Sequence, residues 1–291
     1  MPGNEFENAE IIMTNSATVY CVIPVHNRLQ ITRRCIDYLS AQDYPALQIV
    51  IVDDGSTDGT GEYLAQCEIS NLTVLTGNGK LWWGGSMHKG IAHVMKIARK
   101  DDYLLMLNDD VRIEVNYVSM LVTDSVTHGG AVIGSAQREE RSRALLGSGC
   151  QIDYWGMRIL PIVAQYPNER VDALPGRGAL FPMRAVLSAG NINVKAFPHY
   201  QGDLEYSARI REMGWAIIIS KMADIYSSSA SSDENVRRQG FAKAYFSFRS
   251  KNNLRQRLWF FSLRGPVWLR IWALPRYMVV GGWRMLRKAA S

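Results

Sequence analysis

The segment IVIVDDGSTDGT, residues 49–60, constrains the fold more than any other part of the chain. A run of β-branched residues ends in Asp53 and Asp54 and passes directly into turn residues. Apolar runs of this length, bounded by turn signals, are typical of strands that are buried in a sheet. Because adjacent acids are rarely buried for packing, they indicate that this strand end has a functional role.

The same pattern recurs along the first third of the chain, where each apolar run precedes a segment of helical periodicity. We expect strands over 17–27, 47–54, 71–77 and 102–110, and helices over 28–42, 57–67 and 85–99. This alternation predicts an α/β fold with a mostly parallel sheet flanked by helices. Ligands of such sheets bind outside the carboxyl ends of the strands, where Asp53, Asp54, Asp109 and Asp110 fall.

Composition is that of an ordinary globular protein with a full core. Of the 291 residues, 47% are hydrophobic and 21% are charged. The four cysteines are scattered without metal-like spacing, so we expect reduced core thiols in a cytosolic chain. The N-terminal residues lack the pattern of a secretory signal, and no segment reaches the roughly 18 consecutive apolar residues of a membrane span. We expect a soluble or peripheral protein.

The basic charge of the chain is concentrated at its C-terminal end. Residues 237–291 contain thirteen of the 33 Lys and Arg and none of the 27 Asp and Glu, which leaves a net charge of −7 on residues 1–236. The same segment holds four of the eight tryptophans, interleaved with arginines and interrupted by Pro266 and Pro275. Trp and Arg in short amphipathic segments suit the headgroup region of an anionic bilayer, where each Lys or Arg adds about 1 kcal/mol.

We therefore expect a short tail over 1–16, a catalytic domain over 17–236, and a basic, Trp-rich helical region over 237–291 that associates with membrane. This predicts a cytoplasmic protein that is peripheral on the inner face of the cytoplasmic membrane. The alternative is that the basic helices pack on the main domain or on a second subunit, as in a homodimer. Nucleic acid is not an expected partner, because no nucleic-acid-binding motif accompanies the charge.

Two common nucleotide-binding motifs are excluded by spacing. The glycines at 55, 59 and 61 follow a strand, but Leu64 stands where G-x-G-x-x-G requires its third glycine, and from Gly77 that position is Trp82. The chain also lacks the G-x-x-x-x-G-K-[ST] phosphate loop. A nicotinamide or flavin enzyme is therefore disfavoured.

Four motifs together resemble one family. VIPVHNR, VDDGSTDGT, LNDDV and HYQGDLEYSARIREMGW, in this order and spacing, are similar to the family-two nucleotide-sugar glycosyltransferases, which have the Rossmann-like GT-A fold. The resemblance covers about residues 17–230, and the local pattern is nearest to rhamnosyltransferase-like members.

The resemblance implies a role for each motif. Asp54 matches the carboxylate that accepts a hydrogen bond from the base ring, and Asp53 orients the turn; the alternative is that both acids only cap that turn. LNDDV matches the motif that holds Mg²⁺ or Mn²⁺ against the diphosphate, with Asp110 as the ligand and Asn108 and Asp109 beside it. The wall of the nucleotide pocket would be formed by Pro24, Val25, His26, Asn27 and Arg28.

The acceptor side is implied by the segment around residue 203. Asp203 matches the general base that inverting sugar transfer requires. Glu205 and His199 are weaker acceptor candidates, and a helix N-terminal role fits Glu205 better. Further donor candidates are Lys80, Trp83, Arg177 and Gly178. Many relatives place a metal-ligating histidine about twenty residues after the base, where this chain has Tyr226 and serines.

We therefore expect an inverting, metal-dependent glycosyltransferase that moves a sugar from a nucleotide-diphosphate donor to a hydroxyl of a lipid-linked or surface-polysaccharide acceptor. The expected donor is dTDP-rhamnose, with a UDP-hexose as the alternative. Two other functions stay open on the same fold: a sugar-phosphate nucleotidyltransferase, and a non-catalytic module that binds sugar or lipid. The first would need a glycine-rich loop after the first strand, and PVHNRLQ has no glycine.

Overall fold

A computed structural model describes residues 17–162, 171–227, 253–269, 271–272 and 275 of the chain. The expected tail over 1–16 lies outside the described residues. The end of the expected catalytic domain, 228–236, and most of the basic region over 237–291 also lie outside them.

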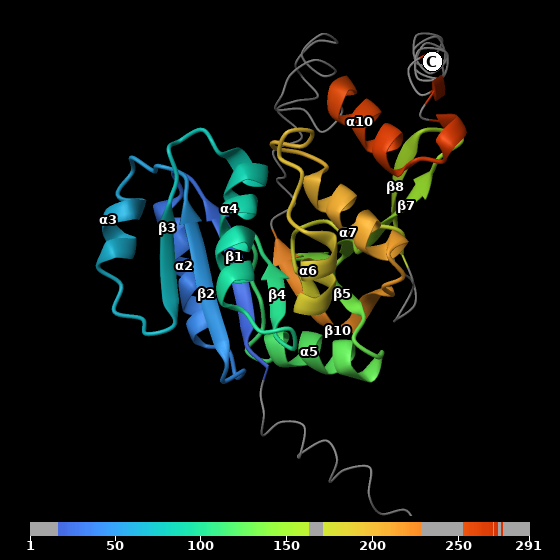
Figure 1. The fold of residues 1–291 in the computed structure, drawn as a ribbon. Coiled ribbons are helices and arrows are strands. Elements are labelled where there is room, and N and C mark those ends of the chain that lie inside the picture. Colours follow the sequence, from blue (N-terminus) through green and yellow to red (C-terminus); the bar gives the residue numbers. More distant parts are fainter. Residues whose placement is uncertain (1–16, 163–170, 228–252, 270, 273–274, 276–291) are drawn as a thin grey trace, which may run out of the picture.

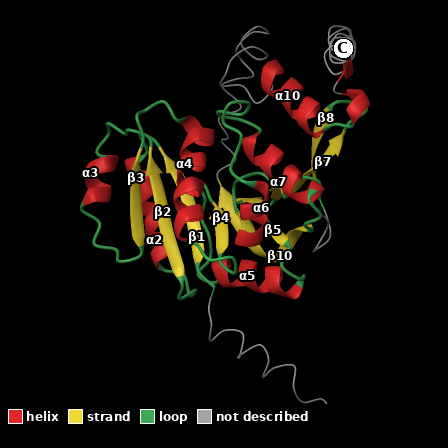
Figure 2. Cartoon of the chain, viewed as in Figure 1, coloured by secondary structure: helices red, strands yellow, loops and turns green. Residues whose placement is uncertain are grey.

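One large mixed sheet forms the centre of the molecule (Figures 1 and 2). Its strands follow the order β10-β5-β9-β4-β1-β2-β3, and β6 pairs with β5. The strands β1 to β4 are all parallel, whereas β9 runs antiparallel between β4 and β5. The strands span β1 Val19–Val25, β2 Leu47–Asp53, β3 Leu72–Thr76, β4 Tyr103–Met106, β5 Val132–Glu139, β6 Leu145–Gly147, β9 Ala179–Pro182 and β10 Ile217–Ser227.

Helices cover both faces of this sheet because the side chains of its central strands alternate between two apolar clusters. Cys21 and Ile23 of β1 pack in the cluster that includes α2 and α5, whereas Val22 packs in the cluster that includes α4, α6 and α7. At Gly90 of α4, an added Cβ would lie 2.3 Å from Val22, so helix and strand are in close contact. The helices span α2 Leu29–Ser40, α3 Thr60–Ala65, α4 Trp82–Ile97, α5 Tyr117–Thr127, α6 Met183–Ala189 and α7 Gly202–Glu212.

A third apolar cluster joins the beginning of the C-terminal region to the α/β domain. Helix α10, Leu254–Arg264, packs beside α7 and the hairpin of β7, Gly149–Asp153, and β8, Arg158–Ile162 (Figure 1). Phe260, Phe261 and Leu269 are fully buried there. Among the described residues, no helix combines the length and the apolar character needed to cross a bilayer.

The strand and helix boundaries differ from expectation mainly next to the acids. Strand β4 ends at Met106, so Asn108, Asp109 and Asp110 lie in the turn that follows it. Helix α4 begins at Trp82, three residues before the expected start. The expectation of a mostly parallel sheet with helices on both faces is confirmed, with β9 as its antiparallel exception.

Candidate active site

The acids after β2 are engaged by the backbone around them. The Asp53 carboxylate accepts hydrogen bonds from the backbone N–H (3.0 Å) and the hydroxyl (2.5 Å) of Ser56, which is the turn-orienting role expected for it. Asp54, at 4% exposure, accepts from three backbone N–H groups, those of Gly79 (2.9 Å), Leu81 (2.8 Å) and Trp82 (3.0 Å). Asp54 therefore caps the start of α4 from a distant part of the chain.

This geometry indicates a structural role for the Asp54 carboxylate. A carboxylate has about four acceptor directions, and three are taken by the loop over 79–82. The loop also lies close enough that a Cβ at Gly77 would stand 2.5 Å from Asp54 Oδ1. Asp54 thus caps the distant start of α4 rather than the turn that follows it, and a contact from Asp54 to a nucleobase stays a prediction.

The turn after β1 is joined to the turn after β2, as its expected place in one pocket wall requires. His26 Nδ1 lies 2.8 Å from the Asp54 carbonyl oxygen, and Asn27 Oδ1 accepts from the Thr57 N–H at 2.7 Å. The side chains of His26, Asn27 and Arg28 are exposed, and Pro24 is half-buried. Val25 is the correction in this group, because its side chain is buried at 3% exposure in the core and only its backbone faces the turn.

The acids after β4 pair with two arginines from different loops. Arg28 lies 3.0 Å from Asp109 Oδ1 and 3.6 Å from Asp110 Oδ2, and Arg177 lies 3.2 Å from the same Asp110 oxygen. Burial raises the pKa of Asp109 to about 6; Arg28 opposes this shift and the neighbouring Asp110 adds to it. The ionised form of Asp109 is therefore held at a free-energy cost.

The remaining oxygens of these two acids fit a divalent cation. Asp109 Oδ2 and Asp110 Oδ1 are buried and accept no hydrogen bond from any described residue, although buried carboxylate oxygens are ordinarily paired. Mg²⁺ and Mn²⁺ prefer oxygen ligands and commonly use one or two carboxylates together with phosphates. No cluster of three His, Cys, Asp or Glu suited to a metal occurs within the described residues, so a cation held by these two acids would take its other ligands from phosphate or water.

Asp203 stands in the first turn of α7, which begins after Gln201 in the left-handed region at φ 65°. Its Oδ2 accepts from the Gly176 N–H at 2.7 Å and its Oδ1 from the Leu204 N–H at 2.9 Å. Burial raises the pKa of Asp203, and those two N–H groups and Arg177 act in the opposite direction. A carboxylate with a raised pKa and limited solvent contact is suited to accept a proton.

Trp83 and Gly176 join Asp203 to the acids after β4. The Trp83 indole N–H donates to Asn108 Oδ1 at 2.9 Å. A Cβ at Gly176 would lie 2.5 Å from the Trp83 ring and 3.0 Å from Asp203 Cβ, so these three residues are in contact. Since Gly176 precedes Arg177, which pairs with Asp110, the acids that follow β4 and the acid of α7 gather at one edge of the sheet.

Two other residues expected to contact the donor, Lys80 and Gly178, are less well placed to do so. Lys80 is exposed on the loop that Asp54 holds. Gly178 is engaged behind the site: its N–H donates to Met106 O, its carbonyl accepts from Ser135 N–H, and an added Cβ would lie 2.6 Å from the Tyr117 hydroxyl. This glycine therefore provides space for packing rather than for a donor.

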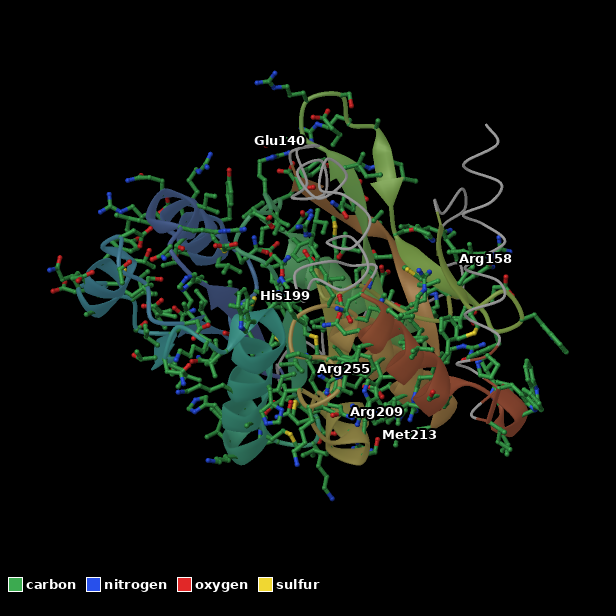
Figure 3. All side chains as sticks on the ribbon, turned by 90° about the horizontal axis from the view of Figure 1, so that it is seen from above. Glu140, Arg158, His199, Arg209, Met213 and Arg255 are labelled. Carbon is green, nitrogen blue, oxygen red and sulfur yellow. The ribbon has the colours of Figure 1, made fainter. Side chains whose placement is uncertain are left out.

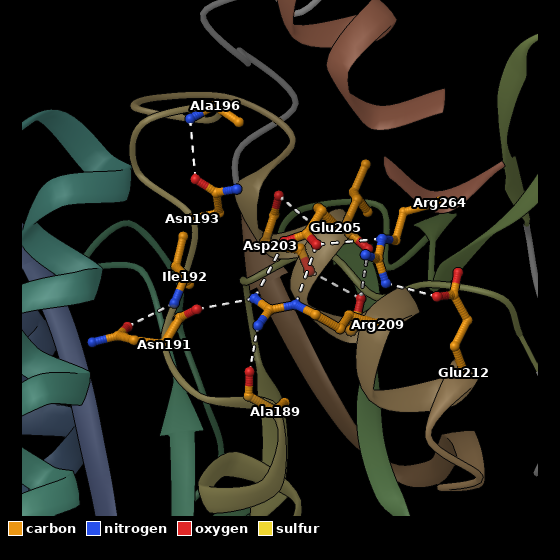
Figure 4. A network of polar contacts seen from close by, with 12 residues as sticks. Ala189, Asn191, Ile192, Asn193, Ala196, Asp203, Glu205, Arg209, Glu212 and Arg264 are labelled. Carbon is orange, nitrogen blue, oxygen red and sulfur yellow. Dashed lines mark hydrogen bonds and ion pairs between the residues drawn. The ribbon is translucent and has the colours of Figure 1, made fainter. Parts of the chain in front are cut away.

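The two weak acceptor candidates, His199 and Glu205, lie in different surroundings. The His199 ring lies 5.5 Å from the Trp82 ring, beside the start of α4 (Figure 3). Glu205 must be corrected, because its carboxylate is 2% exposed and pairs with Arg209 (3.2 Å) and Arg264 (3.4 Å), as Figure 4 shows. Arg264 also pairs with Glu212 at 2.6 Å, so Glu205 helps to fasten α10 to α7.

Two residues that lie at the site were not predicted from the sequence. Gly176 lies in PGRG, where only the second glycine and the arginine were singled out, and its role depends on a contact with α7 far along the chain. Trp82, with φ 59°, was passed over in favour of its neighbour. The positive φ of Trp82 carries no local sequence signal, since bulky residues rarely adopt it.

Comparison with known proteins agrees with this fold. Residues 20–181 match the model of glycosyl transferase family 2, which is more than half of the chain. The protein therefore belongs to glycosyl transferase family 2. Among its relatives, Glycosyltransferase GlyA of Streptococcus pneumoniae is 27% identical over 101 residues and GlyG of the same organism is 25% identical over 108 residues. These matches cover 34% and 36% of this chain, but only 14% and 34% of the relatives' lengths.

Solved structures share the fold at low identity. The mannosyltransferase PcManGT from Pyrobaculum calidifontis, solved with GDP-Man and Mn²⁺, has a TM-score of 0.57 at 15% identity, covering 94% of this chain and 81% of its own. GalNAc-T7, solved with UDP, GalNAc and Mn²⁺, has a TM-score of 0.54 at 15% identity, covering 74% and 44%. These likenesses establish the GT-A architecture.

Proposed function

We propose that this protein transfers a sugar, with inversion, from a nucleoside-diphosphate donor to a hydroxyl group of an acceptor. The observation that carries the proposal is the gathering of Asp109, Asp110 and Asp203 at the carboxyl edge of the sheet, linked by Arg177, Gly176 and Trp83. Ligands of this fold class bind at that edge. Structural neighbours solved with a nucleotide or nucleotide sugar and Mn²⁺ support the donor class.

In this proposal, the chain's own residues divide the work of one displacement. Asp203 accepts the proton of the acceptor hydroxyl as the hydroxyl oxygen attacks the anomeric carbon from the face opposite the diphosphate. The bond between that carbon and the diphosphate breaks, and Arg28 and Arg177 offer charged donors to the departing phosphates. Asp109 and Asp110 would hold a bound Mg²⁺ or Mn²⁺, which neutralises the negative charge developing on the leaving group.

The first test is a thermal-shift screen across nucleoside diphosphates and their sugars, with and without Mn²⁺. Stabilisation by one base class identifies the donor's nucleotide, since a ligand that binds only the folded protein raises its stability by mass action. We propose dTDP-rhamnose as the donor, with a UDP-hexose as the alternative. A complete lack of stabilisation by any nucleotide would contradict the donor site.

The second test concerns Asp203. Replacing it by Asn keeps an acceptor for the Gly176 N–H but removes the base, so transfer should slow by roughly 10²- to 10⁴-fold with unfolding little changed. Because burial raises the pKa of Asp203, and the ionised form is the active one, wild-type activity should fall on acidification at a pH above 3.8, the ordinary pKa of an aspartate. Donor hydrolysis or transfer that is equal in wild type and Asp203→Asn would remove Asp203 from the reaction.

We further propose that the acceptor is lipid-linked or part of a surface polysaccharide, and that the C-terminal region rests on an anionic membrane surface at the cytoplasmic face. Support comes from the apolar side chains exposed on α10 and on the residues after it: Trp259 at 45%, Val267 at 71%, Ile271 at 72% and Trp272 at 60% exposure. The alternative, in which the basic helices pack on the main domain, applies to the other face of α10, because Phe260 and Phe261 are buried there.

Liposome flotation of the full chain tests this proposal. Trp259→Gln with Trp272→Gln should reduce flotation with vesicles of anionic lipid, since interfacial Trp rings contribute to such binding. A matched control is Val115→Gln with Met222→Gln, which replaces side chains of 56% and 63% exposure away from α10. Equal flotation of both double variants and wild type would refute the membrane contact.

A further inference from the structure

Two arginines pair with the acids after β4, and each acid is contacted through one carboxylate oxygen. The other oxygen of each acid is the one that has no partner among the described residues. Arg28, at 46% side-chain exposure, follows β1, and Arg177, at 24%, precedes β9. Both guanidinium groups meet at Asp110 Oδ2, at 3.6 Å and 3.2 Å. Arg28 also holds Asp109 Oδ1 at 3.0 Å. The cluster of Arg28, Asp109, Asp110 and Arg177 is thus formally neutral before any ligand arrives.

This neutrality has consequences for ligand binding at a half-buried place. A divalent cation that binds alone adds two positive charges beside two guanidinium groups, which the surroundings oppose. A diphosphate that binds alone adds negative charge beside Asp109 and Asp110. When the cation and the diphosphate arrive together, each opposes the charge of the other and the cluster stays near neutral. Binding of the two ligands should therefore be coupled.

The positions of the two arginines allow an exchange of partners. Both are long, partly exposed side chains. Arg28 is the N-cap residue of α2, and Arg177 stands between Gly176 and Gly178, whose N–H groups donate to Asp203 and Met106. A guanidinium forms paired hydrogen bonds with phosphate as readily as with carboxylate. Leaving Asp110 for a diphosphate would free the second oxygen of Asp110 for the cation, beside the unpartnered Asp110 Oδ1 and Asp109 Oδ2.

We propose that Arg28 and Arg177 are internal counter-ions that hold the acidic pair in the empty enzyme and transfer to the donor diphosphate when cation and donor bind together. The two arginines thereby make cation binding depend on the nucleotide. This inference rests on the proposed function and adds to it a coupled order of assembly. In energetic terms, each ligand raises the affinity of the other by the same factor.

The experiment measures binding by titration calorimetry, with no turnover required. Mn²⁺ is titrated into the full-length protein with and without the nucleoside diphosphate that the thermal-shift screen selects. For wild type, we expect the diphosphate to increase Mn²⁺ affinity roughly 5- to 150-fold, the usual range of a coupling between two sites. Arg177→Gln should bind Mn²⁺ alone several-fold more tightly than wild type, bind the diphosphate more weakly, and show a smaller coupling factor.

Two further variants separate charge transfer from general damage. Arg177→Lys keeps the charge, so its affinity for Mn²⁺ alone should stay near that of wild type, although it loses the paired hydrogen bonds. Arg184→Gln is the matched control, because it removes an arginine paired with Asp101 at 2.6 Å, before β4 and thus at the other end of that strand. It should leave the affinities for Mn²⁺ alone, for the diphosphate and for Mn²⁺ in the presence of the diphosphate unchanged. Thermal unfolding verifies that each variant is folded.

The outcomes distinguish this inference from the proposed function. If Arg177→Gln binds Mn²⁺ alone no more tightly than wild type and keeps the full coupling factor, the counter-ion role is overturned while the donor site stands. If wild type binds no nucleoside diphosphate, with or without Mn²⁺, the proposed function is overturned and this inference falls with it. A tighter Mn²⁺ site in Arg177→Gln that Arg177→Lys does not reproduce supports the exchange.

Discussion

The acids after β2 and the acids after β4 occupy equivalent places at one edge of the sheet, yet their carboxylates are in opposite conditions. Asp54 accepts three backbone N–H groups, and Asp53 accepts two groups of Ser56. Asp109 and Asp110 each keep one buried oxygen without a partner among the described residues. The first pair builds the loops of the site, and the second pair is left ready for a ligand.

This difference indicates how stability and function are divided within the site. A buried carboxylate whose acceptor directions are filled contributes to the fold, and an unfilled one detracts from it. Substitutions in the two pairs should therefore have opposite effects on folding and on activity.

Asp110→Asn should nearly abolish transfer while leaving the fold intact. The change removes the negative charge assigned to the cation, so we expect the rate to fall by roughly 10²- to 10³-fold, the loss typical when one group that stabilises developing charge is removed. Thermal unfolding should shift little, because the Asp110 side chain is 33% exposed and its arginine partners can turn to water. Rate and melting temperature are measured on the same preparation. An inactive variant that has also lost several degrees of melting temperature would mean that Asp110 is structural.

Asp54→Ala should do the reverse, with its main effect on stability. Three backbone N–H groups in partly buried hydrogen bonds lose their acceptor. Each buried unsatisfied group costs about 1–3 kcal/mol, so at the lower end of that range we expect unfolding to become easier by on the order of 3 kcal/mol. Denaturant unfolding with a fitted m-value measures this loss. Asp54→Asn, which keeps one acceptor oxygen, should lose less. A negligible loss in Asp54→Ala would break the contrast, since Asp54 would then be as dispensable to the fold as Asp110.

Asp109→Asn should stabilise the protein at neutral pH when a chelator removes divalent cations. Burial raises the pKa of Asp109 to about 6, above the ordinary aspartate pKa of 3.8 that applies to the unfolded chain. Protonation therefore favours the folded state, and the stability it contributes is lost as pH rises from about 4 to about 6. Asn cannot ionise, so at pH 7 its unfolding free energy should exceed that of wild type by on the order of 2 kcal/mol.

The pH dependence of that difference is the control. Near pH 4 the Asp109 side chain is largely protonated in the folded protein, so the advantage of Asp109→Asn should shrink toward zero. Paired unfolding curves at pH 4 and pH 7 measure it, since the titrations of other groups are common to both proteins. A variant that is less stable than wild type at pH 7 would show that Arg28 and Asp109 form a net stabilising pair.

The sequence was sufficient for the parallel strands β1 to β4 and for the place of the acids that follow β2 and β4. The strands around Val22, Ile51 and Leu105 are apolar runs, and apolar patterning alone locates such strands. The fold class and the family followed from strand alternation and from four motifs in order. Both are confirmed by the sheet and by the family match.

The sequence was insufficient wherever a partner lies far along the chain. Helix α4 starts at Trp82 because Asp54 caps it from 28 positions away, and capping rules consider only neighbouring residues. Glu205 lies two residues from Asp203, but a pair with Arg264 on α10 decides that it is buried. The unpartnered oxygens of Asp109 and Asp110 also cannot be inferred from sequence, because satisfaction of a polar group is a property of the packed structure.

The smallest expected effect concerns Trp83, which contacts both kinds of region. Its backbone follows the loop that Asp54 holds, while its indole N–H donates to Asn108 and its ring packs on Gly176 beside Asp203. Trp83→Phe removes the N–H but keeps an aromatic ring on Gly176, so unfolding should change by only about 0.5–1.5 kcal/mol, the usual net value of one hydrogen bond. Because the freed Asn108 is next to Asp109 and Asp110, calorimetry should detect a weaker Mn²⁺ site, whereas the pH profile set by Asp203 should stay in place. A displaced pH profile with an unchanged Mn²⁺ site would instead mean that Trp83 acts through Gly176 on Asp203, and would connect the loop built by Asp54 to the base rather than to the cation.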